Sequence, residues 1–225
     1  MNVCVIPARG GSKRIPRKNI NLFHGKPMIA WSIAAAHDCG LFDKVVVSTD
    51  DHEIAEIARA AGAEVPFMRP KELSNDYTAT LPVIAHAVGA LGIADAIPIC
   101  CLYATAPFIQ TNDLAEGLRL LNSKATYTMA VTQFDYPIQR ALKRDHNGKI
   151  TMVHPENMHA RSQDLQSTWH DAGQFYWALA STWTSNIPVF GVGAHGVILP
   201  STRVVDIDTP EDWIRAEALF RVLNQ

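Results

Sequence analysis

The sequence predicts an α/β fold in which a mostly parallel sheet is flanked by helices. Short apolar runs alternate with helical patterns through the first half of the chain, as repeated βα units do. A basic, glycine-containing loop follows the first apolar run, where such sheets bind their ligands. The 225 residues also suffice for one core that buries roughly 70–75% of the unfolded surface.

The expected elements follow from apolar patterning and from turn residues. The predicted strands are short and apolar or β-branched, and they span 3–6, 44–49, 64–68, 96–103 and 126–132. Regular patterning returns at 174–180. The predicted helices span 28–37, 51–62, 80–91, 112–121 and 211–223. Pro27 is the expected first residue of the first helix, Gly40 its stop, Asp51 the N-cap of the second helix and Gly62 its end.

We expect a single domain over residues 1–225 with an excursion at about 133–170. The excursion is polar and rich in His, Arg and Asn, and Asn147-Gly148 predicts a hairpin turn within it. It is either a dimerisation arm or a lid over a substrate. Both interpretations stay open at this point.

Composition excludes several classes of protein. A formal net charge of −2 makes the N-terminal cations a local feature and argues against a nucleic-acid-binding protein. No apolar run approaches the roughly 18 residues of a membrane span, and no secretory signal is visible, so we expect a soluble cytoplasmic protein with no membrane partner. The four cysteines form no C-x-x-C pair, and Cys4, Cys100 and Cys101 lie in apolar runs typical of a reduced core. No zinc motif or nucleophile elbow is present.

The most informative segment is the loop between Pro7 and Asn19. Two adjacent glycines and a serine let backbone N–H groups approach an anion, and nearby cations neutralise several negative charges. It matches neither the Walker A pattern nor G-x-G-x-x-G. We therefore predict a nucleoside triphosphate site, with a solvated basic turn as the alternative. Its five cations are Arg9, Lys13, Arg14, Arg17 and Lys18.

A carboxylate pair forms the second chemical motif. In a strand, Asp206 and Asp208 would point the same way and offer two oxygen ligands to Mg²⁺, or to Mn²⁺ in its place. The alternative is that Asp208 caps the last helix. Thr209, Pro210 and Asp212 already form a workable cap, which favours the metal site. Arg69 and the segment 76–80 either complete a base and ribose pocket or form a connecting loop.

These motifs together resemble the CMP-sialic-acid synthetase (acylneuraminate cytidylyltransferase) family nearly end to end. The resemblance rests on the segments 6–13 and 18–19, on Ser48-Thr49-Asp50, on Arg69-Pro70-x-x-Leu73 and on Asp206-Ile207-Asp208-Thr209. The stretches 103–108, 161–165 and 170–177 are most similar to members that act on pseudaminic acid. Tyr103 stands where enzymes for N-acetylneuraminate have glutamine, which favours a modified nonulosonic acid.

The resemblance implies a nucleotide-diphospho-sugar transferase (Rossmann-like) fold, a homodimer whose excursion reaches the partner's site, and a role in flagellin or surface glycosylation. The implied nucleotide-binding residues are Ala8, Arg9, Gly10, Gly11, Ser12, Lys13, Lys18, Asn19, Arg69 and Thr80. The implied sugar-binding residues are Tyr103, Arg161, Gln174 and Tyr176.

The expected reaction joins CTP and a nine-carbon acid sugar into a CMP-sugar and diphosphate. The anomeric hydroxyl attacks the α-phosphorus in line, Arg9 and Lys13 stabilise the leaving diphosphate, and Mg²⁺ is held by Asp206 and Asp208. Asp208, through a water on the metal, is the expected base. The rival acceptors are legionaminic, N-acetylneuraminic and 3-deoxy-octulosonic acids, and a remote rival is a non-catalytic module that binds nucleotide or nucleic acid.

Overall fold

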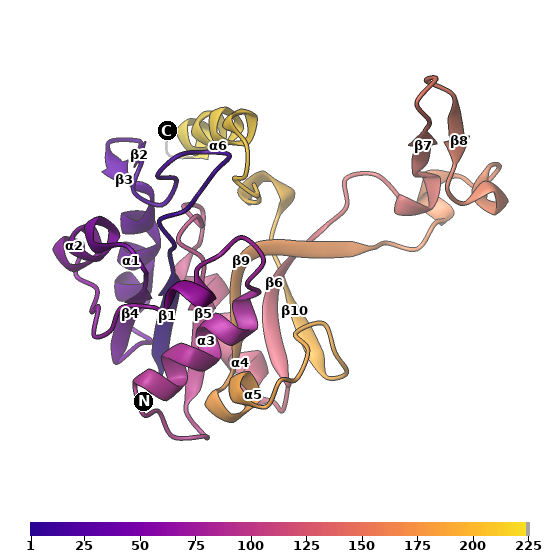
Figure 1. Cartoon of the computed structure of the whole chain (residues 1–225). Helices are drawn as coiled ribbons and strands as arrows, with labels where there is room; N and C mark the ends of the chain where they lie inside the picture. Colours follow the sequence, from indigo (N-terminus) through magenta and orange to yellow (C-terminus); the bar gives the residue numbers. More distant parts are fainter. Residues whose placement is uncertain (224–225) are drawn as a thin grey trace.

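The computed structural model describes residues 1–223 and is built on a six-stranded sheet with the order β10-β6-β9-β5-β1-β4 (Figure 1). β1 pairs in parallel with β4 and β5, and β10 pairs in parallel with β6. β9 is antiparallel to both of its neighbours, β5 and β6. The predicted α/β class with a mostly parallel sheet is therefore confirmed. The strands are β1 (Val3–Pro7), β4 (Lys44–Ser48), β5 (Pro98–Leu102), β6 (Tyr127–Gln133), β9 (Trp169–Leu179) and β10 (Ala194–Ile198).

Helices cover both faces of this sheet (Figure 1). Alternate β1 side chains point to opposite faces: Cys4 and Ile6 pack with α1, α2 and α4, whereas Val3 and Val5 pack with α3 and α5. Burial on both faces explains the continuous apolar strand patterns. The helices are α1 (Met28–Asp38), α2 (His52–Ala60), α3 (Thr80–Ala90), α4 (Thr111–Asn122), α5 (Ala180–Thr184) and α6 (Pro210–Leu223). None of the helices within residues 1–223 combines the length and apolar character needed to cross a bilayer.

Asp51 caps α2 as predicted, since its side chain accepts a hydrogen bond from the backbone N–H of Ile54 at 3.0 Å. Pro27 differs from the prediction, because it ends the short ladder of β2 (Leu22–Phe23) and β3 (Lys26–Pro27) and α1 begins at Met28. The predicted strand at 64–68 is wrong. Only Glu64 forms a bridge, to Val46, and Pro66 offers no N–H to continue the ladder.

The common facing predicted for Asp206 and Asp208 requires a strand, but the segment that holds them, 204–208, forms none. From Val205 to Asp208 buried apolar side chains still alternate with polar ones, but Val205 and Ile207 pack against Phe23 and α6 rather than beside a sheet strand. This third apolar cluster also holds Ile15, so it joins the loop after β1 to the segment before α6. Strand geometry therefore gives no reason for the Asp206 and Asp208 side chains to point the same way.

Residues 134–168 leave the sheet between β6 and β9 and extend far from the body of the molecule (Figure 1). Their outer part is a hairpin of β7 (Leu142–Arg144) and β8 (Ile150–Met152). The turn predicted at Asn147-Gly148 is confirmed: Asp145 Oδ1 accepts from the N–H groups of Asn147 and Lys149, and Gly148 has a φ of 85°. We call residues 134–168 the arm.

The close approach of α4 to the sheet predicts a sharp effect at Gly117. A Cβ at this position would lie 2.7 Å from Cδ1 of Trp177 and 2.8 Å from Cε2 of Phe175, both fully buried rings. We expect Gly117→Ala to lower the free energy of unfolding by about 1–3 kcal/mol, as overpacking does, despite the better helix propensity of alanine. Urea denaturation followed by tryptophan fluorescence measures it.

Gly89 in α3 provides the matched control, since a Cβ there would meet nothing within 4 Å. Gly89→Ala should leave the stability unchanged or raise it by up to about 1 kcal/mol. Equal unfolding midpoints for the two variants would contradict the tight packing at Gly117.

Candidate active site

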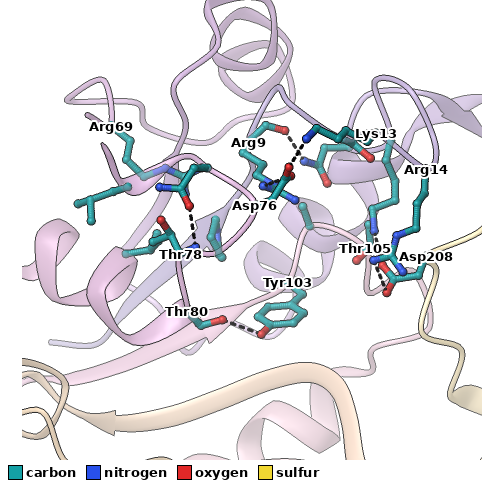
Figure 2. Close-up of a pocket in the computed structure, with 18 residues that line it drawn as sticks. Arg9, Lys13, Arg14, Arg69, Asp76, Thr78, Thr80, Tyr103, Thr105 and Asp208 are labelled. Atoms are coloured by element: carbon teal, nitrogen blue, oxygen red, sulfur yellow. Dashed lines mark hydrogen bonds and ion pairs between the residues drawn. The ribbon is translucent and has the colours of Figure 1, made fainter. Parts of the chain in front are cut away.

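The main cavity, of about 540 Å³, opens at the carboxyl ends of β1 and β5. Its walls come from the loop after β1, the segment 69–80, the residues that follow β5, and Asp208 (Figure 2). Ligand sites of open α/β sheets lie at this edge, because loops from neighbouring parallel strands converge there. Of the residues predicted to bind nucleotide, those that line the cavity are Arg9, Ser12, Lys13, Lys18, Asn19, Arg69 and Thr80.

The remaining predicted loop residues, Ala8, Gly10 and Gly11, do not line the cavity. Ala8 is buried in the core, and a Cβ on Gly11 would meet nothing within 4 Å. A Cβ on Gly10 would lie 2.6 Å from Asp51 Oδ2, and the Gly10 N–H donates to Asp50 Oδ1 at 3.1 Å. Glycine at position 10 is thus required by the close approach of the loop to the start of α2.

The five cations of this loop divide into two groups. Arg9, Lys13, Arg14 and Lys18 line the cavity, whereas Arg17 does not. Arg17 has a φ of 57° and its guanidinium pairs with Asp51 at 2.5 Å and with Glu53. The hydrogen bond with Asp51 raises the pKa of Arg17 and lowers that of Asp51. Arg17 therefore fastens the loop to α2 and does not supply charge to the cavity.

Asp208 lies on the cavity wall between two cations. Its carboxylate is 2.7 Å from Arg14 Nη2 and 3.1 Å from Lys18 Nζ, and Lys18 also donates to the Ile207 carbonyl at 2.6 Å. Thr209 and Asp212 exchange hydrogen bonds at the start of α6, so the predicted cap is confirmed and Asp208 is not needed for it.

Asp206 lines a different cavity, of about 330 Å³, together with Asp135, Asp171 and Asp212. Desolvation, and next the charge of Asp208, raise the pKa of Asp206, so the two carboxylates interact although they face different cavities. Within residues 1–223 no group of three or more His, Cys, Asp or Glu side chains could hold a metal ion. Mg²⁺ seldom takes an all-protein cage, so Asp208 together with phosphate oxygens and waters would suffice to hold it in the main cavity.

Arg69 enters the cavity from a buried position. Only 5% of it is exposed, its Nε donates to Ser74 Oγ at 3.0 Å, and Asp50 lies 3.8 Å away. Burial lowers the pKa of Arg69 from its high usual value. Its backbone N–H donates to the Thr49 carbonyl at 2.7 Å, which ties the segment 69–80 to the end of β4.

Tyr103 separates the main cavity from an apolar cavity of about 320 Å³, whose walls include Trp183 and Phe190. Its hydroxyl is 2.8 Å from Thr80 Oγ1 (Figure 2), and its ring centroid is 5.5 Å from that of Tyr176. The Tyr176 hydroxyl donates to Asp171. Burial raises the pKa of Tyr103 to about 12 and that of Tyr176 well above its usual value, so both hydroxyls keep their protons.

Two predicted sugar-binding residues lie outside these cavities. Gln174 is 2% exposed; its backbone carbonyl accepts from the Tyr103 N–H at 2.8 Å and its side chain donates to the Arg203 carbonyl at 2.7 Å. It lies behind Tyr103 and not on the cavity wall. Arg161 belongs to the arm, is exposed, and pairs with Asp164 at 2.7 Å, so it does not meet the cavities of its own chain.

Two carboxylates of the site had no role in the sequence-based prediction. Asp76 pairs with both Arg9 and Lys13 (Figure 2), and Asp171 lines the apolar cavity. Asp76 belongs to the segment 76–80, which the sequence alone assigns either to a base and ribose pocket or to a connecting loop, and its partners are more than sixty positions away in sequence. No local pattern indicates that contact. Asp171 precedes Gly173, whose φ of 61° marks a turn of the backbone within β9, and this irregularity is visible only in three dimensions.

Comparison with known proteins shows the family and the fold of this chain. The model of the family described as "Cytidylyltransferase" matches residues 3–181. A pseudaminic acid cytidylyltransferase of Campylobacter jejuni is 42% identical over 100% of this chain and 98% of its own length. A CMP-N,N'-diacetyllegionaminic acid synthase of Legionella pneumophila is 30% identical over 99% of this chain and 97% of its own length.

Among solved structures, a CMP:2-keto-3-deoxy-manno-octonic acid synthetase complexed with CTP has a TM-score of 0.74. The two sequences are 17% identical, and the alignment covers 99% of this chain and 100% of the solved one. This likeness supports the fold. The family match over most of the chain and the full-length relatives carry the assignment beyond the fold: this chain belongs to the cytidylyltransferase family.

Proposed function

We propose that this cytidylyltransferase transfers CMP from CTP to pseudaminic acid and releases diphosphate. The observation that carries the proposal is the 42% identity over the whole chain to a relative named for that activity. The cavity has the required chemical features, with cations at one end and a tyrosine that leads to an apolar cavity at the other. The anomeric hydroxyl of the sugar attacks the α-phosphorus, the bond from that phosphorus to the diphosphate oxygen breaks, and Asp208 is the proposed base for the hydroxyl proton. Positioning and charge stabilisation therefore dominate catalysis.

Arg9, Ser12 and Lys13 bind the phosphates in this proposal, and the two cations stabilise the charge that grows on diphosphate. Asn19 supports them, since its amide donates to the Arg9 carbonyl at 3.0 Å. Buried Arg69 and Thr80 lie on the same cavity wall, where they would contact base and ribose. Lys18 holds Asp208 against the cavity from the opposite side.

The acceptor sugar occupies the space around Tyr103. The acyl substituents of the sugar fit the apolar cavity bounded by Trp183 and Phe190. Thr80 orients the Tyr103 hydroxyl, and the ring of Tyr176 lies against that of Tyr103. Gln174 supports Tyr103 from behind through its backbone carbonyl. These contacts favour an acceptor with both hydroxyl and apolar substituents.

Mg²⁺ is the proposed metal, with Asp208 as its protein ligand in the main cavity. Asp206, the second predicted ligand, lines the neighbouring cavity and would have to turn toward Asp208 to join it. When bound, the ion supplies Lewis-acid polarisation of a phosphate. Asp208 is then shared between the metal and its two cationic neighbours, Arg14 and Lys18, which would position the carboxylate on the cavity wall.

A homodimer completes the proposal, with the arm of one subunit reaching the partner's site. The β7–β8 hairpin has three residues in each strand and exposes Leu142 and Ile150, and Met158 is exposed elsewhere in the arm. An isolated two-stranded hairpin is only marginally stable in water, so this arm gains from a covering surface. In that arrangement Arg161 would meet the sugar carboxylate in the partner's site.

The first test measures diphosphate release with CTP and Mg²⁺ against four acids: pseudaminic, legionaminic, N-acetylneuraminic and 3-deoxy-octulosonic acid. We expect turnover with pseudaminic acid to exceed the others by at least about 100-fold in kcat/KM, as a site built for particular polar substituents allows. Preference for legionaminic acid would favour the second candidate, which the 30% identical relative supports. Absence of turnover with all four would overturn the enzymatic proposal.

The second test removes a carboxylate charge from the site. Asp208→Asn should reduce kcat/KM by about 100-fold or more, about 3 kcal/mol of transition-state stabilisation, because a preorganised electrostatic contact is lost. Glu211→Gln is the matched control: it neutralises an exposed carboxylate three residues further along, in the first turn of α6. Steady-state kinetics of Asp208→Asn equal to those of the wild type would remove Asp208 from the mechanism.

A further inference from the structure

Asp76 bridges the two cations that the proposed function assigns to the phosphates. Its Oδ1 is 2.8 Å from Arg9 Nη1 and its Oδ2 is 2.5 Å from Lys13 Nζ (Figure 2). The Asp76 side chain is about one third exposed, at the rim of the main cavity. Both oxygens of one carboxylate are therefore engaged with the basic loop across the cavity mouth.

The segment that presents Asp76 is ordered by contacts independent of those ion pairs. Asn75 Oδ1 accepts from the N–H groups of Tyr77 and Thr78 at 2.9 and 3.0 Å, which closes a turn around Asp76. Ser74 accepts from the buried Arg69 and donates to the Pro70 carbonyl. The turn holds the carboxylate in place without help from Arg9 or Lys13, so a change at Asp76 should leave the segment folded.

While Arg9 and Lys13 are paired with Asp76, less of their positive charge is available to attract a phosphate chain. Hydrogen bonding to Lys13 and the charges of Lys13 and Arg9 lower the pKa of Asp76, so this competitor is charged at neutral pH. A triphosphate carries more negative charge than one carboxylate and therefore displaces Asp76 from the two cations. Its favourable binding free energy is reduced, because the ion pairs with Asp76 are lost.

We propose that Asp76 is a built-in competitor for the phosphate-binding cations, which weakens the binding of CTP and diphosphate by pairing with Arg9 and Lys13. This inference rests on the proposed assignment of those two cations to the phosphates. Its consequence for turnover lies in the second half of the reaction. As diphosphate leaves, Asp76 forms its ion pairs with Arg9 and Lys13 again. The site therefore releases a multiply charged product without leaving two cations unpaired.

Calorimetric titration of the full-length protein with CTP and with inorganic diphosphate, each with Mg²⁺, tests the proposal. Asp76→Asn keeps the size of the side chain and removes its charge. We expect it to bind both ligands about three- to tenfold more tightly, the range that loss of two partly exposed ion pairs allows. The diphosphate constant for product inhibition should fall by the same factor.

Glu72→Gln is the matched control, because Glu72 belongs to the same segment and its carboxylate makes no ion pair among residues 1–223. It removes the same charge but no contact with Arg9 or Lys13, so its affinities should change less than twofold. Equal tightening in both variants would overturn the competition and leave only a general effect of charge. Unchanged or weaker binding in Asp76→Asn would overturn it as well, and would make Asp76 a residue that supports the cations.

A double-mutant cycle with Arg9→Ala separates this inference from the proposed function. If Asp76 acts through Arg9, the tightening caused by Asp76→Asn shrinks in the Arg9→Ala background. Arg9→Ala that weakens CTP binding while Asp76→Asn has no effect overturns the competition alone. Arg9→Ala that binds CTP like the wild type overturns the phosphate assignment and the competition together.

Discussion

The packing of Phe23 against the C-terminal helix α6 fixes the distance between two walls of the candidate site, the basic loop after β1 and Asp208. Phe23 is fully buried, with its ring edge-on to Trp213 at 5.5 Å and to Phe220 at 5.2 Å. Ile15 and Ile207 join the same cluster, one just before Lys18 and the other just before Asp208. Burying two such side chains contributes roughly 1.5–3 kcal/mol each, whereas a partly exposed ion pair contributes about 1 kcal/mol at most. The apolar cluster therefore positions the charges, and the ion pairs adjust their final geometry.

Repulsion among like charges is the second constraint on this site. Arg9, Lys13, Arg14 and Lys18 all come from one short loop and line one cavity. Asp76 pairs with Arg9 and Lys13. Asp208 pairs with Arg14 and Lys18, so each carboxylate offsets the charge of two cations. This sharing lets the loop concentrate positive charge in the cavity, because each carboxylate offsets part of the repulsion between its two cations.

The sequence predicts those parts of the fold that depend on local signals. The Asp51 cap, the Asn147-Gly148 turn and the βα alternation are each set by residues near one another in the chain. The strand expected at 64–68 fails because sheet pairing is decided by a neighbour, and only Glu64 reaches β4. The same limit applies to the site. Sequence patterns indicate which residues carry charge, but the turning of Arg17 toward α2 and the separation of Asp206 from Asp208 depend on tertiary packing.

The antiparallel strand β9 places the base of the arm at the same sheet edge as the cavities. β5 and β6 are parallel to each other, since β9 is antiparallel to both, so β6 ends at the sheet edge where the main cavity opens. Gln133 pairs with Trp169 there, which means that the arm both leaves and returns at that edge. A few residues along β9 from this point, Asp171 pairs with Val131 and contacts Tyr176, which lies against Tyr103. The base of the arm and the two tyrosines are therefore linked by strand pairing and side-chain contacts within one short part of the sheet, beside the apolar cavity.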